Sequence, residues 1–257
     1  MADSARWRGG AVSPTGRFAA MQPPAERPRG GRQRIPRPAG WVPGDIAPWL
    51  GDDEPAVSLS LLDVRRRLAD LPPARPAPEP EFALERRASA VLVPLFEEDE
   101  KARLILTKRP ETMPSHQGEI AFPGGKLEPT VDSDLRATAL REAQEEIGLD
   151  PGAVEIVAEL DGIGTVASQF VIAPFVGMLT GRPTLHPDPR EVVRVFDVEL
   201  GELLVPGVHH AELWHTAGSS EIPGDLEVHF FEVADETIWG ATARILYGFL
   251  GHLVGDS

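Results

Sequence analysis

The chain of 257 residues holds 40 acidic against 25 basic side chains, which gives a formal charge of −15, and it contains no cysteine. The charge disfavours a duplex-DNA binder held by phosphate neutralisation, and the missing thiols exclude disulfides, zinc–thiolate sites, iron–sulfur clusters and cysteine nucleophiles. Pro, Gly or charge interrupts the apolar runs too soon for a bilayer span, and no secretory segment opens the sequence. We therefore expect a cytoplasmic protein that binds neither nucleic acid nor membrane.

Arginine and proline are concentrated near the beginning of the chain. Residues 1–40 hold eight Arg against two acids, and 14 of the 26 prolines precede residue 86. Because residues 1–40 have too few large apolar side chains to offset the chain entropy of folding, we expect a disordered basic arm. It is either a passive tail or a contact for RNA, membrane or acidic protein. Residues 41–85 should form a short helix and a proline-rich linker before a globular domain at 86–257.

The globular part mixes strand and helix patterns. Short β-branched or apolar runs, typical of strands, occur at 88–96, 103–108, 119–122, 154–160, 170–179, 192–198 and 227–233. Helices are expected at 135–147, closed by Gly148, and from 237 to about 253, where an apolar face recurs at helical spacing. Because strict βαβ alternation is absent, these elements predict an α+β fold around a mixed β-sheet.

Three acids share one face of the first of these helices. Glu142, Glu145 and Glu146 stand at positions i, i+3 and i+4, so their carboxylates are neighbours. Like charges on adjacent turns repel, and Arg141 alone cannot neutralise three of them, whereas divalent cations that take oxygen ligands can. The pattern therefore predicts a Mg²⁺ or Mn²⁺ site on this helix face.

This segment resembles the Nudix hydrolase family, whose box reads G-x5-E-x7-R-E-U-x-E-E-x-G-U, with U a bulky apolar residue. Residues 141–149, which read Arg-Glu-Ala-Gln-Glu-Glu-Ile-Gly-Leu, fit the second half of the box at its fixed positions. The resemblance implies a Nudix-type α/β/α sandwich at 86–257. It also implies divalent-metal-dependent hydrolysis of a pyrophosphate bond in a nucleotide-linked substrate.

The first half of the box departs from the family pattern. Gly125 stands sixteen positions before Arg141, where the pattern has fourteen. Ser133 occupies the position of the first Glu, so Asp132 or Asp134 is expected to take the place of that carboxylate. Asp132 or Ser133 is also the expected N-cap of the helix.

The resemblance implies roles for individual residues. The metal ligands would be Gly125, through its carbonyl, Glu142, Glu145 and Glu146. The catalytic residues would be Arg141, which orients the glutamates, Glu142 and Glu145. The general base is either a box glutamate or a later carboxylate, Glu191 or Glu202, and it stays unassigned.

Residues before the box are similar to the signature of the coenzyme A pyrophosphatase group, L-L-T-x-R-[SA]-x3-R-x3-G-x3-F-P-G-G. The matching residues are Leu106, Thr107, Arg109, Gly118 and Phe122–Gly125, and Ile238–Leu246 is similar to the I-W-G-x-T-A segment of the group. Pro110 and Pro114 depart from the signature, and Pro114 removes a cation. The implied substrate is coenzyme A or acyl-CoA, cleaved to (acyl-)4′-phosphopantetheine and adenosine 3′,5′-bisphosphate.

Side chains beside the box are candidate substrate contacts. They are Arg109, His116, Gly124 and Lys126. Trp239 is expected at a helix start facing the core, and His209, His210 and His215 on the surface or in strands. Two other functions stay open: a Nudix pyrophosphatase for NADH, ADP-ribose or nucleoside triphosphates, and a non-catalytic nucleotide-sensing Nudix module. A homodimer is compatible with the sequence.

Overall fold

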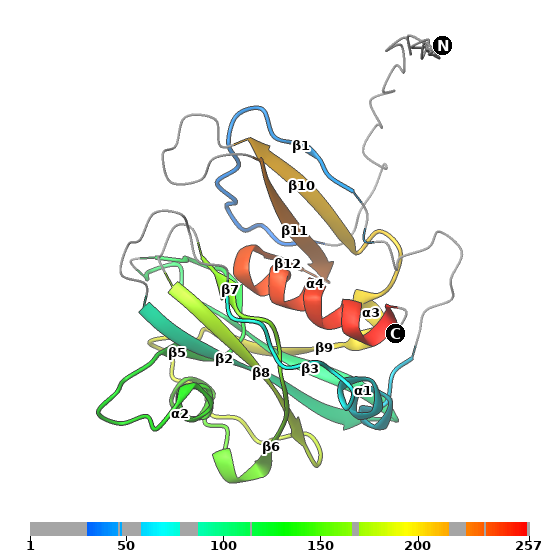
Figure 1. Ribbon diagram of the computed structural model, residues 1–257. Helices are drawn as coiled ribbons and strands as arrows, with labels where there is room; N and C mark the ends of the chain where they lie inside the picture. Colours follow the sequence, from blue (N-terminus) through cyan, green and yellow to red (C-terminus); the bar gives the residue numbers. More distant parts are fainter. Residues whose placement is uncertain are drawn as a thin grey trace, which may run out of the picture.

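The computed structural model describes residues 30–45, 47, 58–77, 87–113, 115–165, 170–215, 225–233 and 235–255. The larger sheet holds β2 (Arg87–Glu98), β3 (Lys101–Lys108), β4 (Ile120–Ala121), β5 (Gly124–Lys126), β6 (Val154–Glu159), β7 (Ile163–Gly164), β8 (Phe170–Leu179) and β9 (Arg194–Glu199). The smaller sheet holds β1 (Val42–Pro43), β10 (His209–His215), β11 (Asp225–Val233) and β12 (Glu236–Trp239). The helices are α1 (Leu61–Leu68), α2 (Leu135–Ile147), α3 (Leu200–Leu203) and α4 (Gly240–Val254), with a 3-10 turn at Pro151–Ala153 (Figure 1).

The centre of the larger sheet opens between β2 and β3. Strand β2 runs parallel to β8 along most of its length, but it pairs with β3 only near the turn that joins them. Towards its start β2 pairs instead with β5, with Ala90 opposite Gly125, while β3 pairs with β4. The Leu92 amide donates to the Pro123 carbonyl at 2.9 Å. The segment from β4 to β5, which carries Gly124 and Gly125, is therefore fixed in the middle of the sheet.

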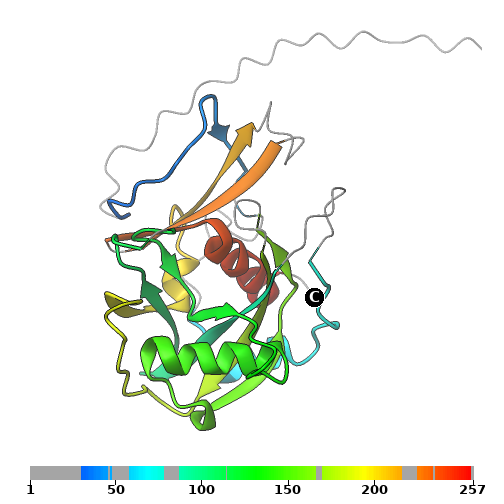
Figure 2. The same ribbon diagram turned by 90° about the vertical axis from the view of Figure 1, so that its left-hand side faces the viewer.

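Helices cover both faces of the larger sheet, as expected for an α/β/α sandwich. Alternate residues of β2 face opposite sides: Ala90, Leu92 and Phe96 pack with α2, whereas Val93 and Leu95 pack in the cluster that contains α4. Figures 1 and 2 show α2 and α4 on the two sides of this sheet. The fold predicted from the sequence is confirmed.

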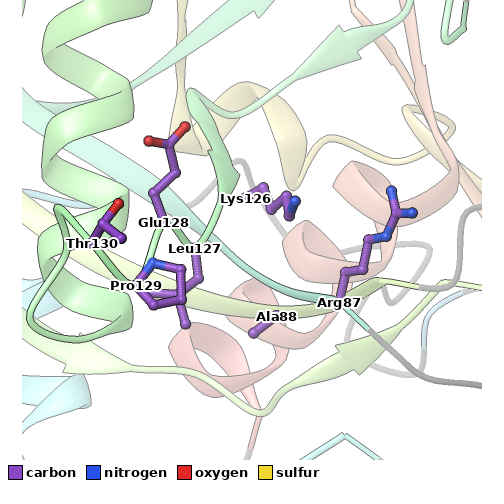
Figure 3. A pocket seen from close by; sticks show the side chains of 7 residues that line it. All are labelled: Arg87, Ala88, Lys126, Leu127, Glu128, Pro129 and Thr130. Atoms are coloured by element: carbon purple, nitrogen blue, oxygen red, sulfur yellow. The ribbon is translucent and has the colours of Figure 1, made fainter.

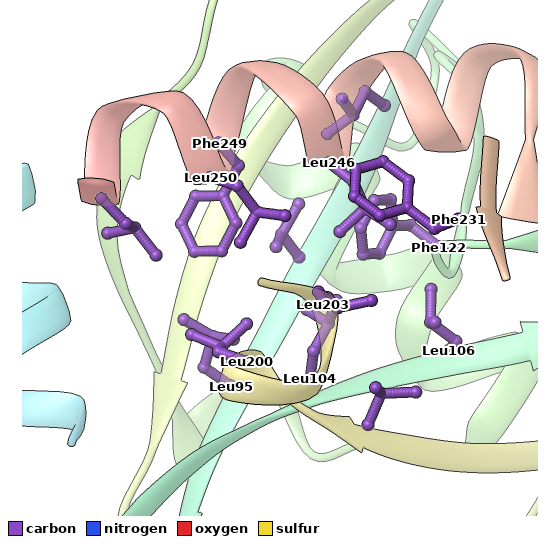
Figure 4. Packing of buried hydrophobic residues seen from close by; sticks show 14 of the residues in the cluster. Leu95, Leu104, Leu106, Phe122, Leu200, Leu203, Phe231, Leu246, Phe249 and Leu250 are labelled. Carbon is purple, nitrogen blue, oxygen red and sulfur yellow. The ribbon is translucent and has the colours of Figure 1, made fainter. Parts of the chain in front are cut away.

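The larger core lies under α4. Leu246, Phe249 and Leu250 of this helix are fully buried, and Figure 4 shows them above Leu95 and Leu104 of the sheet. Each such side chain contributes about 1.5–3 kcal/mol through burial. The other side of α4 contacts β11, so the helix lies between the two sheets (Figure 1). Among the described residues, no helix is long and apolar enough to span a membrane.

Helix α2 has the bounds that the sequence predicts, but its N-cap differs. The Asp134 side chain accepts a hydrogen bond from the Ala137 amide at 2.8 Å and is therefore the cap. The expectation of Asp132 or Ser133 is wrong, because the Asp132 carboxylate is bound to Arg141 instead. At the other end Gly148 adopts φ 68°, a left-handed conformation that glycine accommodates without strain.

Of the smaller sheet only β11 was expected, from the run at 227–233, and the sheet changes two expectations. Residues 236–239 pair with β11, so the last helix begins at Gly240 (φ 66°) rather than at 237, and Trp239 ends a strand. Residues 30–40, which were assigned to a disordered arm, lie against this sheet, where Arg37 pairs with Glu212 at 2.8 Å. The rest of the predicted arm, 1–29, lies outside the described residues.

Candidate active site

The acidic face of α2 meets β5 at its two glycines. A Cβ atom built on Gly125 would overlap the Glu142 carboxyl group, so a side chain here would push that carboxyl group away from the strand. The Gly124 amide donates a hydrogen bond to Glu146 Oε2 at 3.1 Å. Two helix carboxylates and the backbone of the Gly-Gly pair therefore form one site.

Arg141 holds the site together through several carboxylates. Its Nε and Nη2 atoms donate to the two oxygens of Asp132 at 2.8 and 3.0 Å, a bidentate ion pair. The guanidinium also lies 2.9 Å from Glu142 Oε1 and donates to Glu145 Oε2 at 3.1 Å. A further hydrogen bond of 3.2 Å reaches the Lys126 carbonyl. Arg141 thus connects the helix, the loop before it and strand β5.

Asp132, rather than Asp134, carries the carboxylate that accompanies the box arginine. It is buried and also accepts hydrogen bonds from the Glu128 amide at 2.9 Å and from the Thr138 hydroxyl at 3.0 Å. The Arg141 guanidinium, together with these donors, holds the pKa of Asp132 well below its usual range. Asp132 is therefore ionised in the folded protein and fixes Arg141 in place.

Burial disfavours the ionised forms of the two inner glutamates, Glu142 and Glu146. Burial raises the pKa of Glu146 to about 8, although the Gly124 amide and Arg109 act in the opposite direction. Burial also raises the pKa of Glu142, and Arg141 opposes this shift. The Glu191 carboxylate adds repulsion to both. A site that holds several carboxylates in this way favours the binding of a cation.

The donors suit a hard divalent cation that is only partly enclosed by protein. The Glu145 side chain is 61% exposed and, like Glu142, is bound to Arg141. No group of three or more acidic or histidine side chains in the described ranges converges on one metal position. Mg²⁺ is commonly held by one or two carboxylates and completed by water and substrate phosphates. Glu142, Glu146 and the Gly125 carbonyl, which are all oxygen donors, fit that requirement.

Of the two later carboxylates considered as general base, Glu191 lies near the site. It is exposed and close enough to raise the pKa values of Glu142 and Glu146. Glu202 is exposed on α3, which packs against β3, β9 and β11. The sequence alone did not distinguish Glu191 from Glu202 as the candidate general base.

Arg109 follows β3 and points towards the site. Its Nη1 atom lies 3.9 Å from Glu146 Oε1. Its Nε atom is buried and has no hydrogen-bond partner among the described residues. An unsatisfied buried donor of a cation costs free energy, which an anionic ligand would relieve. Arg109 is thus positioned to receive a phosphate oxygen next to the glutamates.

The remaining candidate contacts are less closely gathered. Gly124 lies inside the site, and Lys126 is exposed at the end of β5. His116 hydrogen-bonds to Glu119 at 2.9 Å, and this bond raises the pKa of the imidazole. Trp239 is half-buried and packs on Trp214 with 6.1 Å between ring centroids, so it does not face the core from a helix as expected.

The family model and the relatives that match this chain all describe Nudix proteins. A sequence model of the NUDIX domain matches residues 86–218. The uncharacterised Nudix hydrolase NudL of Photorhabdus laumondii is 34% identical over 190 residues, which cover 74% of this chain and 95% of that protein. Nudix hydrolase 22, chloroplastic, of Arabidopsis thaliana is 41% identical over 169 residues, 62% of this chain and 53% of that protein.

A solved MutT/nudix family protein from Enterococcus faecalis aligns with a TM-score of 0.47 at 15% identity, over 70% of this chain and 66% of that one. The matching residues of the NUDIX domain model include both glycines of β5 and the whole of α2. With this match and the similarity to NudL along nearly its whole length, the chain belongs to the Nudix hydrolase family.

Proposed function

We propose that this Nudix hydrolase cleaves the pyrophosphate bond of coenzyme A or acyl-CoA in a Mg²⁺- or Mn²⁺-dependent reaction. The products would be (acyl-)4′-phosphopantetheine and adenosine 3′,5′-bisphosphate. The observation that carries the hydrolytic part is the ion-pair network of Asp132, Arg141 and Glu142 against Gly125. The substrate is supported by the coenzyme A signature, whose Arg109 lies beside Glu146.

The proposed chemistry is the attack of water on one phosphorus atom of the diphosphate. A divalent cation, when bound, supplies charge neutralisation and lowers the pKa of a coordinated water. Glu142, Glu145, Glu146 and the Gly125 carbonyl would hold it, and Arg109 would bind a diphosphate oxygen. Glu145 is proposed, with Arg141, to keep the carboxylate network in place. The water loses its proton to a carboxylate as the bridging P–O bond breaks, and the leaving phosphoryl group keeps the bridging oxygen.

Two other functions are tested by the same experiment. Pro110 and Pro114, which depart from the coenzyme A signature, favour NADH, ADP-ribose or nucleoside triphosphates as substrates. Pro114 lies outside the described residues. A nucleotide-sensing module without turnover is disfavoured, because the carboxylates of the second half of the box are present and Arg141 is engaged with them.

The deciding experiment is product analysis by mass spectrometry with each substrate in parallel and Mg²⁺ or Mn²⁺ present. We expect coenzyme A to be turned over faster than ADP-ribose, NADH or nucleoside triphosphates, with adenosine 3′,5′-bisphosphate among the products. Equal or faster turnover of ADP-ribose would remove the coenzyme A proposal. Ligand binding without turnover of any of these compounds would instead support the sensing module.

Other properties of the protein belong to the same proposal. We propose a cytoplasmic enzyme whose partner is a small nucleotide diphosphate, with neither nucleic acid nor membrane as a partner. A homodimer is compatible with this function. We also propose that 86–257 is the catalytic domain and that 41–85 is the preceding helix and linker. The helix in that segment, α1, is capped by Ser60.

A further inference from the structure

A surface pocket adjoins the proposed diphosphate site. It has a volume of about 530 Å³ and is lined by residues from the start of β2 and from β5 and the loop that follows it: Arg87, Ala88, Lys126, Leu127, Glu128, Pro129 and Thr130 (Figure 3). Lys126 is the residue after Gly125, so its side chain points to the face of the sheet opposite the one that α2 covers. The Lys126 carbonyl accepts a hydrogen bond from Arg141, while its side chain lines the pocket.

The strand register brings two cations together at this pocket. Lys126 lies opposite Ser89 in the antiparallel pair of β2 and β5. Arg87 precedes Ser89 by two residues, so Arg87 and Lys126 are diagonal neighbours on one face of the sheet, with Cβ atoms somewhat less than about 7–8 Å apart. In Figure 3 their charged ends lie on the same side of the pocket, and the Glu128 carboxylate lies on the other side.

Neither cation is compensated within the part of the chain that the structure describes. Arg87 and Lys126 are both exposed, and neither forms an ion pair or a side-chain hydrogen bond with a described residue. Two like charges at this spacing repel one another, and a multiply charged anion between them would remove that cost. A phosphate monoester, with nearly two negative charges at neutral pH, matches this pair well.

The pocket also lies at a suitable distance from the site of cleavage. Arg87 precedes Ala90, the partner of Gly125, by three residues, or about 10 Å along the strand. A nucleoside with one phosphate on its 5′ oxygen and another on its 3′ oxygen holds the two phosphates on opposite sides of a single ribose. Because β5 borders the opening between β2 and β3, one phosphate at the box and the other in the pocket would lie on the two sides of β5.

From these observations we propose that Arg87 and Lys126 bind a 3′-phosphate monoester on the nucleoside half of the substrate. This inference rests on the proposed function and makes it more specific. The pocket distinguishes 3′-phosphorylated dinucleotides, such as coenzyme A, from ADP-ribose and NADH, which lack that group. Arg87 and Lys126 act in binding and specificity and take no part in bond cleavage.

The test compares coenzyme A with 3′-dephospho-coenzyme A as substrates of the full chain. We expect wild-type protein to prefer coenzyme A in kcat/KM by about tenfold or more, and Arg87→Gln and Lys126→Gln each to reduce this preference by about tenfold, through KM for coenzyme A. Arg66→Gln removes an exposed arginine of α1, away from the pocket, and should keep the wild-type ratio. Unchanged preference in both pocket variants would overturn the inference.

A binding measurement without turnover separates this inference from the proposed function. Calorimetric titration with adenosine 3′,5′-bisphosphate and with 5′-AMP, in metal-free buffer, should show tighter binding of the bisphosphate by the wild type. Arg87→Gln should lose about tenfold of that advantage at an unchanged melting temperature. Equal binding of the two nucleotides by the wild type would contradict the inference. Failure of the proposed function is a different result, namely no hydrolysis of coenzyme A or its dephospho form.

Discussion

At the scale of single residues, Asp132 has the contacts that the first Glu of the Nudix box would be expected to make. It lies at a position that the sequence spacing does not assign, yet it accepts two hydrogen bonds from Arg141 and is buried. Its neighbour Asp134 has a different task, the cap of α2. Substitutions of Asp132 and Asp134 therefore form a matched pair, because the two residues are close in sequence and of the same type but have different contacts.

Asp132→Asn should lower kcat/KM by about 10–100-fold, because a neutral amide no longer holds the Arg141 guanidinium by two charged oxygens. Asp134→Asn should stay within about twofold of the wild type, since Asn is as good an N-cap as Asp. Steady-state kinetics of the two variants with one substrate measure this difference. An equal loss in both would refute the distinct role of Asp132.

Gly125 supports a second prediction at this scale. Gly125→Ala should reduce kcat/KM by about a hundredfold, because the added Cβ displaces the Glu142 carboxyl group from the Gly-Gly backbone. Gly181→Ala is the control, since a Cβ on Gly181 meets no atom within 4 Å. Kinetics and melting temperature should be measured together. Full activity of Gly125→Ala would show that this close contact is unnecessary.

At the scale of elements, Glu236 connects the two sheets. This buried side chain of β12 accepts from Lys108 Nζ of β3 at 2.9 Å and from Arg194 Nη1 of β9 at 3.0 Å. The Gln33 side chain also donates to it at 2.5 Å. Lys108 is the residue before Arg109, so the cluster and the proposed substrate contact are neighbours along the chain.

Glu236→Gln should reduce the free energy of unfolding by about 3 kcal/mol, because Lys108 loses its buried counter-ion, whereas Arg194 keeps its pair with Asp235. Glu155→Gln removes one partner of an exposed pair, Arg65 with Glu155 at 2.6 Å, and should cost less than about 1 kcal/mol. Urea unfolding of both variants provides the comparison. A similar decrease in the free energy of unfolding in the two variants would mean that the ion pairs of Glu236 contribute little to the packing of the two sheets on each other.

At the scale of the whole molecule, stability should depend on two buried imidazoles between the smaller sheet and α4. His209 Nε2 lies 3.3 Å from His229 Nδ1, and His229 stacks on Tyr247 of α4. Burial, with some repulsion from His229 and His210, lowers the pKa of His209 to about 3. Burial and the charge of Arg244 lower the pKa of His229 to about 4.

His209 and His229 are therefore protonated in the unfolded chain, but not in the folded protein, as the pH falls below about 6.5. This difference should lower the free energy of unfolding by about 2 kcal/mol per histidine at pH 5. Glu146 acts in the opposite direction, because its raised pKa weakens folding as the pH rises towards 8. Comparison of wild type with His229→Asn cancels this contribution. The difference in unfolding free energy between pH 7 and pH 5 should be smaller in the variant, and equal slopes would contradict the assignment.

Local patterns predicted the elements whose information lies within a few residues. Helix α2 and its glutamates follow from helical spacing and from Gly148, and β2, β3 and β8 follow from β-branched runs. In the smaller sheet, β11 follows from the apolar run at 227–233. Strands β1 and β10 could not be predicted, because β1 pairs with β10 far along the chain and β10 is rich in His and Glu rather than alternating. The choice between Asp132 and Asp134 also depended on a distant partner, Arg141.

The central claim is that the carboxylates of α2 against Gly125 bind the divalent cation on which hydrolysis depends. Mn²⁺ titration, followed by loss of the free-ion electron paramagnetic resonance signal, tests it most directly in wild type, Glu146→Gln and the surface control Arg66→Gln. The claim predicts that the wild type and Arg66→Gln bind Mn²⁺ equally and that Glu146→Gln loses most of that binding together with its hydrolytic activity. Undiminished Mn²⁺ binding and hydrolysis in Glu146→Gln would contradict it.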